Sequence, residues 1–189
     1  LPTYLDKIAS FRNRSIVVCT GNEGMAAHHY YGVIERRPDI STEAYDDVEI
    51  SVGANERGFI LELWGTLPNV YWISIRSPSG EVRQGFRPGF GQSQTYRFIY
   101  ERTIVTLDTI LVEPESGEEL FSMRFENPQE GVWTIRVSLV GDANGGNFHM
   151  WLPITQFLSS ETVFLKPNPY TTITNPGYSN LSLTVGGYD

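Results

Sequence analysis

The sequence predicts a mainly β protein, in which an antiparallel, jelly-roll-like β-sandwich is inserted between two strands of a partial α/β domain. From about Ala27 to about Leu165, short runs of alternating apolar and polar residues are separated by Gly, Pro, Asn and Asp. The flanking segments instead hold a helical pattern and two apolar runs that end in glycines. We therefore expect residues 1–26 to form a helix, a strand and a loop, residues 27–165 the sandwich, and residues 166–189 a return strand.

The first segment has the pattern of a helix followed by a strand. Within residues 1–13, Leu1, Leu5 and Ile8 have the spacing of one helix face. The run 15–24 is rich in β-branched residues and stops at a glycine, which is typical of a buried strand that leads into a loop at its carboxyl edge. Cys19 falls inside this apolar run, so we expect it to be a small buried side chain and not a nucleophile.

Asn22 lies in the loop that follows, between Gly21 and Gly24. Functional groups collect at the carboxyl edge of parallel strands. A side-chain amide held there is a neutral donor suited to stabilising a developing oxyanion. The alternative is that Asn22 is a turn residue chosen for its tolerance of unusual backbone angles.

Strict alternation of apolar and polar residues predicts most of the sandwich strands. Eight or more such strands indicate a sandwich or a barrel, and their irregular lengths favour a jelly-roll-like sandwich. The run 181–185 mirrors 16–19, so we expect these two to be parallel neighbours, and a helical turn is expected from Pro153 to Phe157. The clearest alternation is at 48–52, 71–75, 121–125 and 133–139, and further strands are expected at 28–35, 58–64, 81–86, 93–100, 103–112 and 146–151.

Composition excludes several classes of function. The 189-residue chain has a formal net charge of −8, which would repel the phosphate backbone of nucleic acid. No apolar run approaches the roughly 20 residues that a membrane-spanning helix needs, so no membrane span is expected. The single cysteine excludes an internal disulfide and fits either a cytosolic or a secreted protein. No cofactor is expected.

Candidate metal sites have simpler interpretations. His28 and His29 are adjacent, so in a strand they point to opposite faces and do not readily share one metal ion. The segment 142–147 offers oxygen ligands but lacks a closing bidentate carboxylate, and we interpret it as a hairpin turn. Asp46 and Asp47 are interpreted as a solvated strand edge. No metal site is therefore predicted.

The tryptophans leave one alternative function open, that of a carbohydrate- or surface-binding β-sandwich module. Such binding needs an aromatic ring on an exposed face. Trp133 shares its face with Ile135 and is expected in the core, whereas Trp72 is out of phase with Tyr71 and Ile73. Trp72 is therefore the candidate for an exposed ring.

The two end segments resemble a known family. The run Ile16–Gly24 is similar to the strand and loop that carries the oxyanion-hole asparagine in subtilisin-like serine peptidases (subtilases), and the run Pro176–Asp189 is similar to the strand that follows it. Ordinary subtilases have only a short segment between the two, whereas clostridial-type members, including spore germination proteases, have a jelly-roll insert here. The pair His28-His29 and the run Phe148–Pro153 also resemble that subgroup.

The resemblance implies that the chain is a fragment of a serine endopeptidase, with Asn22 as oxyanion-hole donor and Gly21, Gly24, His28 and His29 at or near the substrate cleft. No run resembles the serine segment of the family, and the Asp and His segments would precede this stretch, so we expect the chain alone to be inactive. The insert would brace the catalytic domain or shape access to the cleft. The parent enzyme would act on a protein or peptide, and the resemblance favours an extracellular or spore-associated location with contact to the cell wall or spore surface.

Overall fold

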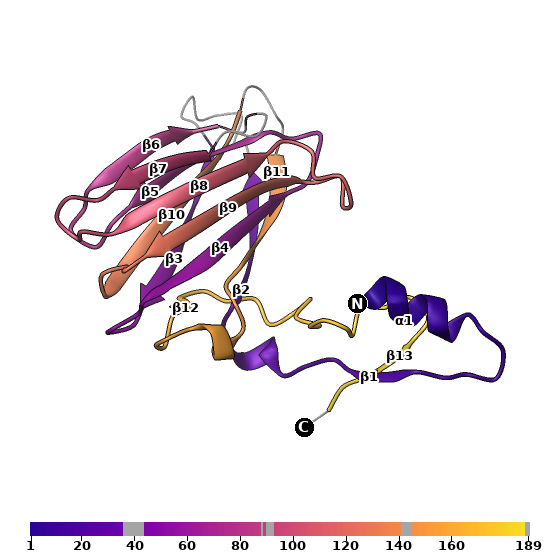
Figure 1. Ribbon diagram of the computed structural model, residues 1–189. Helices are drawn as coiled ribbons and strands as arrows, with labels where there is room; N and C mark the ends of the chain where they lie inside the picture. The colour runs from indigo at the N-terminus through magenta and orange to yellow at the C-terminus, as the bar shows by residue number, and fades with distance from the viewer. Residues whose placement is uncertain (36–43, 88, 90–92, 141–144, 188–189) are drawn as a thin grey trace. The chain divides into compact units, whose positions relative to one another are not determined.

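A computed structural model describes residues 1–35, 44–87, 89, 93–140 and 145–187. The chain forms two compact units (Figure 1). One consists of Leu1–Ala27 and Pro169–Asp189 and is called the end unit below. The other, His28–Asn168, is called the sandwich unit. A single β-rich unit is thus bracketed in sequence by the two halves of the other.

The end unit is built around two short parallel strands. Helix α1 (Pro2–Ala9) starts with a proline in its first turn, where the missing N–H costs nothing. Strand β1 (Val17–Cys19) pairs in parallel with β13 (Leu183–Val185). The prediction that these two segments, which are far apart in sequence, are parallel neighbours is therefore confirmed. A 3₁₀ turn, η1 (Glu23–Met25), follows β1 and was not predicted.

The prediction that β1 is a buried strand is wrong for this chain. The Val17 side chain is 63% exposed, and Cys19 is exposed as well. A parallel strand becomes buried only when a layer of structure covers each face of its sheet. The sheet of β1 and β13 has two strands, and the end-unit helix α1 contains no buried residue. The apolar composition of the run therefore does not bury it here.

The sandwich unit consists of two antiparallel sheets, which confirms the predicted β-sandwich. One sheet has the strand order β12-β3-β10-β5-β6, and the other has the order β2-β11-β4-β9-β8-β7. The chain changes sheet at most of its connections. The strands are β2 (His29–Glu35), β3 (Tyr45–Val52), β4 (Gly58–Gly65), β5 (Tyr71–Arg76), β6 (Val82–Phe86), β7 (Ser93–Arg97), β8 (Ile104–Ile110), β9 (Glu119–Glu126), β10 (Gly131–Leu139), β11 (Gly145–Trp151) and β12 (Val163–Phe164), with a 3₁₀ turn η2 (Thr155–Phe157) before β12.

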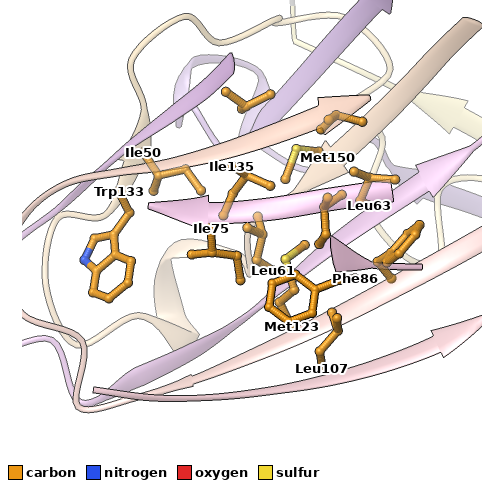
Figure 2. Packing of buried hydrophobic residues seen from close by; sticks show 14 of the residues in the cluster. Ile50, Leu61, Leu63, Ile75, Phe86, Leu107, Met123, Trp133, Ile135 and Met150 are labelled. Atoms are coloured by element: carbon orange, nitrogen blue, oxygen red, sulfur yellow. The ribbon is translucent and has the colours of Figure 1, made fainter. Parts of the chain in front are cut away.

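The core lies between the two sheets, because alternate residues of each strand point inward. Figure 2 shows buried aliphatic, aromatic and methionine side chains from both sheets meeting in this layer. Trp133 is fully buried, as the sequence predicts, and its indole N–H donates to the Gln129 carbonyl at 2.9 Å. The labelled members of the cluster in the figure are Ile50, Leu61, Leu63, Ile75, Phe86, Leu107, Met123, Trp133, Ile135 and Met150.

One local prediction is corrected by the sheet topology, and another by side-chain contacts. Residues 141–144 lie outside the described residues, but the strands that they join, β10 and β11, belong to different sheets. The predicted hairpin turn at 142–147 is therefore wrong, since a hairpin needs paired neighbouring strands. Asp46 and Asp47 lie on β3, which pairs with β10 on one side, while β12 reaches only Ile50 and Ser51 on the other. The two carboxylates are nevertheless half-buried and have side-chain partners: Asp46 accepts a hydrogen bond from the Tyr30 hydroxyl at 2.8 Å, and Asp47 pairs with Arg136.

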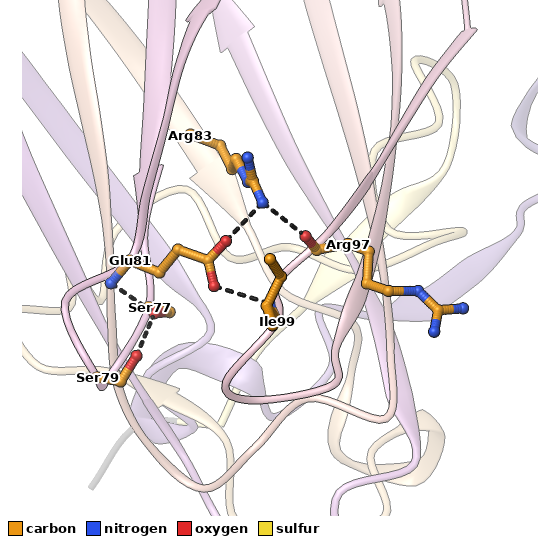
Figure 3. A network of polar contacts seen from close by, with 6 residues as sticks. All are labelled: Ser77, Ser79, Glu81, Arg83, Arg97 and Ile99. Carbon is orange, nitrogen blue, oxygen red and sulfur yellow. Dashed lines mark hydrogen bonds and ion pairs between the residues drawn. The ribbon is translucent and has the colours of Figure 1, made fainter.

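A polar network ties the outermost strands of the two sheets together. β6 ends one sheet and β7 ends the other. Figure 3 shows Glu81 and Arg83 reaching the segment around Arg97 and Ile99. One Glu81 oxygen is 2.5 Å from Arg83 Nη2, and the other accepts from the Ile99 N–H at 2.7 Å. Arg83 Nη2 also donates to the Arg97 carbonyl at 2.9 Å. The network thereby satisfies polar groups at an open side of the sandwich.

Candidate functional site

The loop after β1 is built on backbone contacts within the end unit. Thr20 N–H donates to the Val185 carbonyl at 3.1 Å, which continues the parallel pairing one residue past Cys19. Gly21 has a φ of +86°, a conformation that L side chains rarely adopt. A Cβ at Gly21 would also overlap the Thr174 hydroxyl. Glycine is therefore required at this position, and the loop turns sharply at the end of the strand.

The Asn22 side chain is exposed and precedes the 3₁₀ turn η1. As the residue that starts this turn it makes no side-chain capping bond. Within the described part of the chain its amide has no hydrogen-bond partner, so its donors are available to a ligand. The start of the loop is anchored two residues earlier, where Thr174 N–H donates to the Thr20 carbonyl at 2.8 Å. The geometry is that of an accessible neutral donor on a held loop.

The segment that precedes β13 supports this loop, a feature that the sequence patterns did not reveal. Gly177 packs so closely on β1 that a Cβ there would lie 2.9 Å from the Cys19 carbonyl oxygen. The Thr184 hydroxyl donates to the Gly177 carbonyl at 2.5 Å. The only sequence signal is the run Asn175-Pro176-Gly177, whose residues are typical of turns.

Asp6 joins helix α1 to the same return segment. Its carboxylate accepts from the Ser179 hydroxyl at 2.7 Å and from the Leu181 N–H at 2.8 Å. These hydrogen bonds favour the charged form and lower the pKa of Asp6. The two sequence-distant parts of the end unit are thus joined by polar contacts as well as by the parallel pair.

His28 and His29 belong to the sandwich unit, whereas Gly21, Asn22 and Gly24 belong to the end unit. Both histidines are buried, and His29 is only 1% exposed. His29 Nδ1 is 3.0 Å from the Asn168 carbonyl, and its Nε2 is 2.8 Å from His149 Nδ1. Among the described residues no group of three or more His, Cys, Asp or Glu side chains is placed to hold a metal ion. The cleft-adjacent position of His28 and His29 stays a prediction.

His29 is part of an aromatic stack that sequence reasoning missed. Its ring stacks on Trp151 with centroids 3.9 Å apart, and the centroid of the His149 ring lies 5.1 Å from that of His29. Burial disfavours a charged imidazole and lowers the pKa of His149. The signal was present, because His149 and Trp151 alternate with the core residues Phe148 and Met150 and so share the outer face of β11.

Trp72 lies outside the core, as the sequence predicts. It is half-buried and belongs to the outward-facing residues of β5, while Tyr71 and Ile73 are fully buried. The ring contributes to a pocket on the outer face of the five-stranded sheet.

No protein-family model matches the sequence, and no curated protein matches it either. The structure of the Clostridium perfringens CspB protease matches the fold over 100% of this chain, with a TM-score of 0.83 and 23% sequence identity. The chain has the fold of part of that protease. It spans 37% of the length of that chain. At this identity the likeness establishes a shared fold. No helix in the described residues has both the length and the apolar character needed to cross a bilayer.

Proposed function

We propose that this chain is part of a subtilisin-like serine endopeptidase in which Asn22 is one donor of the oxyanion hole. The observation that carries the proposal is the parallel pair of β1 and β13, which joins two segments on opposite sides of the sandwich unit in sequence. The pair carries an exposed asparagine on a glycine-supported loop at its carboxyl end. The fold of the whole chain, which is similar to that of part of a clostridial protease, supports the same conclusion.

In the proposed reaction, a serine supplied by the rest of the parent protein attacks the carbonyl carbon of the scissile peptide bond. A histidine takes the serine proton and an aspartate orients that histidine. The carbonyl oxygen gains negative charge as the tetrahedral intermediate forms. The Asn22 side-chain N–H donates to this oxygen, and a donor positioned in advance stabilises the developing charge without having to reorganise. Gly21 and Gly24 let the loop backbone approach the substrate closely.

The sandwich unit is proposed to brace the catalytic domain or to shape access to its cleft, with His28 and His29 at the point where the sandwich starts. At this point the buried His29 ring stacks on the half-buried Trp151, and such close packing suits a bracing role.

The proposed substrate is a protein or peptide. We propose an extracellular or spore-associated location, in which the enzyme contacts the cell wall or spore surface.

The test is replacement of Asn22 in the full-length parent enzyme. Asn22→Ala removes the donor from an exposed position, so we expect the fold and KM to change little. In subtilisin itself, loss of the equivalent donor lowers kcat by about 10²–10³, and we expect a decrease of that order, a figure taken from that enzyme and not calculated for this chain. Steady-state kinetics on a fluorogenic peptide would measure it.

Two further variants separate the donor from the loop. Asn22→Asp keeps the shape of the side chain but removes its N–H, and we expect it to be at least as damaging as Asn22→Ala. Met25→Ala alters a 92% exposed side chain in the same turn and should leave kcat unchanged. Unaltered turnover in Asn22→Ala would contradict the assignment.

A further inference from the structure

The outer face of the five-stranded sheet contains a polar pocket of about 360 Å³. This volume lies within the range of about 300–1,000 Å³ typical of small-molecule sites. The pocket forms across strands β5, β10, β3 and β6, which are neighbours in one sheet (Figure 1). Trp72 supplies an aromatic surface, and the remaining lining residues are Asp47, Ser74, Arg76, Val82, Gln84, Thr134 and Arg136.

Trp72 stands beside a small residue on the outer face of the sheet. In the strand register Trp72 lies opposite Ser138 of β10, and Tyr45 of β3 lies opposite Ser138 on the other side. Ser138 is fully buried, whereas Trp72 is half-buried and lines the pocket. The indole is therefore partly accessible to a ligand in the pocket.

Arg136 is fixed in position by two kinds of contact. Its Nε and Nη2 each lie 2.7 Å from an oxygen of Asp47, in a bidentate pair. Its guanidinium carbon also lies 3.8 Å from the centroid of the Tyr45 ring. The Arg136–Asp47 pair therefore offers oriented hydrogen-bonding groups while its net charge is close to zero.

Arg76 supplies the excess positive charge of the pocket. It is exposed, and its Nη2 donates to the Thr134 hydroxyl at 3.1 Å. In the described part of the chain no carboxylate forms an ion pair with it. A guanidinium that has no carboxylate beside it can bind the carboxylate of a ligand with two parallel hydrogen bonds. The pocket is thus a local positive site on a chain whose net charge is −8.

We propose that this pocket binds a saccharide that bears a carboxylate. The apolar C–H face of a sugar ring packs on the Trp72 indole, since indole combines a large apolar face with low conformational entropy. Sugar hydroxyls bond to Gln84 and to the Arg136–Asp47 pair, and the carboxylate bonds to Arg76. This binding function is independent of peptide hydrolysis, so it stands or falls separately from the role of Asn22.

The experiment is isothermal titration calorimetry on the 189-residue chain with matched probes. One pair is α-1,4-trigalacturonate and its fully methyl-esterified form, in which each carboxylate is replaced by a neutral methyl ester. A second pair is the disaccharide of N-acetylglucosamine and N-acetylmuramic acid, and N,N′-diacetylchitobiose, which lacks the lactyl ether that carries the carboxylate. We expect each acidic probe to bind about tenfold more tightly than its neutral counterpart, because a hydrogen bond to a charged group contributes that much.

Variants then assign the binding to the pocket. Trp72→Ala should weaken both acidic probes by about tenfold or more through the lost apolar contact. Arg76→Gln should remove the preference for the acidic probe and leave the affinity for the neutral one unchanged. The matched control is Trp64→Ala, which removes an indole of similar exposure from the outer face of the other sheet and should have no effect.

Thermal unfolding of each variant checks that it is folded, and Arg76→Gln tests the site even if Trp72→Ala does not fold. The proposal is supported if an acidic probe binds about tenfold more weakly to Trp72→Ala or Arg76→Gln and with unchanged affinity to Trp64→Ala. Equal affinity for acidic and neutral probes overturns it, as does the absence of heat with all four probes at millimolar concentration.

Discussion

Glu119 brings a carboxyl group into the core of the sandwich. The residue is 0% exposed, and one of its oxygens accepts from the Tyr71 N–H at 3.0 Å. The other oxygen has no hydrogen-bond partner in the described part of the chain. Burial disfavours the charged form and raises the pKa of Glu119 to about 7. A titratable group of this kind makes the stability of the fold depend on pH.

We predict that the contribution of Glu119 to the free energy of unfolding decreases as the pH rises from about 4.5 to about 7, because the folded pKa of Glu119 lies above its ordinary value of 4.5. The folded state holds the proton more tightly than the unfolded state does, so the stabilisation is complete below pH 4.5 and is lost as Glu119 ionises. Glu119→Gln removes this dependence. The wild-type protein should lose roughly 3 kcal/mol relative to the variant across this range, at about 1.4 kcal/mol per pKa unit.

Urea unfolding of both proteins at several pH values measures the difference. The lowered pKa of His149 acts at acidic pH in both proteins and cancels when their profiles are subtracted. Glu115→Gln, at an exposed position, serves as the control for loss of one charge. A flat difference profile between wild type and Glu119→Gln would show that Glu119 does not titrate in this range.

At the residue scale, sequence reasoning succeeded where a side chain's role follows from strand phase. It placed Trp133 in the core and Trp72 outside it. It missed Glu119, whose phase on β9 matches the core residues Phe121 and Met123, because a charged residue is normally taken to face solvent. It also missed that Arg136 lines the same pocket as Trp72. The two residues come from different strands, β10 and β5, and strand phase does not reveal which strands are neighbours.

At the scale of elements, the network at β6 and β7 holds the open side of the sandwich. Glu81 connects a side chain, Arg83, with the backbone of Ile99 (Figure 3). The exposed fraction of its side chain is 13%, so the contacts are partly shielded from solvent. An edge strand exposes backbone groups that have no partner in the sheet, and this network provides contacts at two such strands, β6 and β7.

We predict that Glu81→Ala destabilises the protein by roughly 1–2 kcal/mol, because it leaves the Ile99 N–H and Arg83 without this acceptor. Hydrogen exchange should become faster at the Ile99 amide and in β6 and β7, while β10 in the centre of its sheet keeps its protection. Glu130→Ala, which removes an exposed glutamate, is the matched control. Unchanged exchange at Ile99 would argue against this role of the network.

At the scale of the whole molecule, the two units differ in how much core they contain. Every member of the main hydrophobic cluster, from Ile34 to Phe164, lies in the sandwich unit. Helix α1 of the end unit has no buried residue. Burial of apolar surface is the dominant favourable contribution to folding. The sandwich unit therefore has a hydrophobic core of its own, as an independently folding domain requires.

We predict that residues 28–168 expressed alone unfold cooperatively, with a Tm within about 5 °C of the whole chain. Circular dichroism and calorimetry would measure this. A polypeptide in which a flexible linker joins residues 1–27 to residues 169–189 should show no cooperative transition. An unfolded 28–168 segment would mean that the sandwich depends on the end unit.

We also predict that the purified 189-residue chain does not hydrolyse peptides. It offers the proposed oxyanion donor without a recognisable serine nucleophile segment, and a donor alone does not form the covalent intermediate. A fluorogenic peptide assay and labelling with a fluorophosphonate probe would both be negative. Hydrolysis that co-purifies with the chain and is abolished by Asn22→Ala would refute the view that it is a fragment.

The sequence by itself determined the mainly β architecture, the parallel pairing of β1 with β13, and the placement of Asn22 on a glycine-bracketed loop. The strands and the loop follow from strand periodicity and turn residues, and the pairing was expected because two similar apolar runs lie at opposite ends of the chain. Tertiary structure alone decided that β1 is exposed, that β10 and β11 belong to different sheets, and that Arg136 pairs with Asp47 in the pocket that Trp72 also lines. Burial and side-chain pairing depend on which strands become neighbours, and that choice is made by residues far apart in the chain.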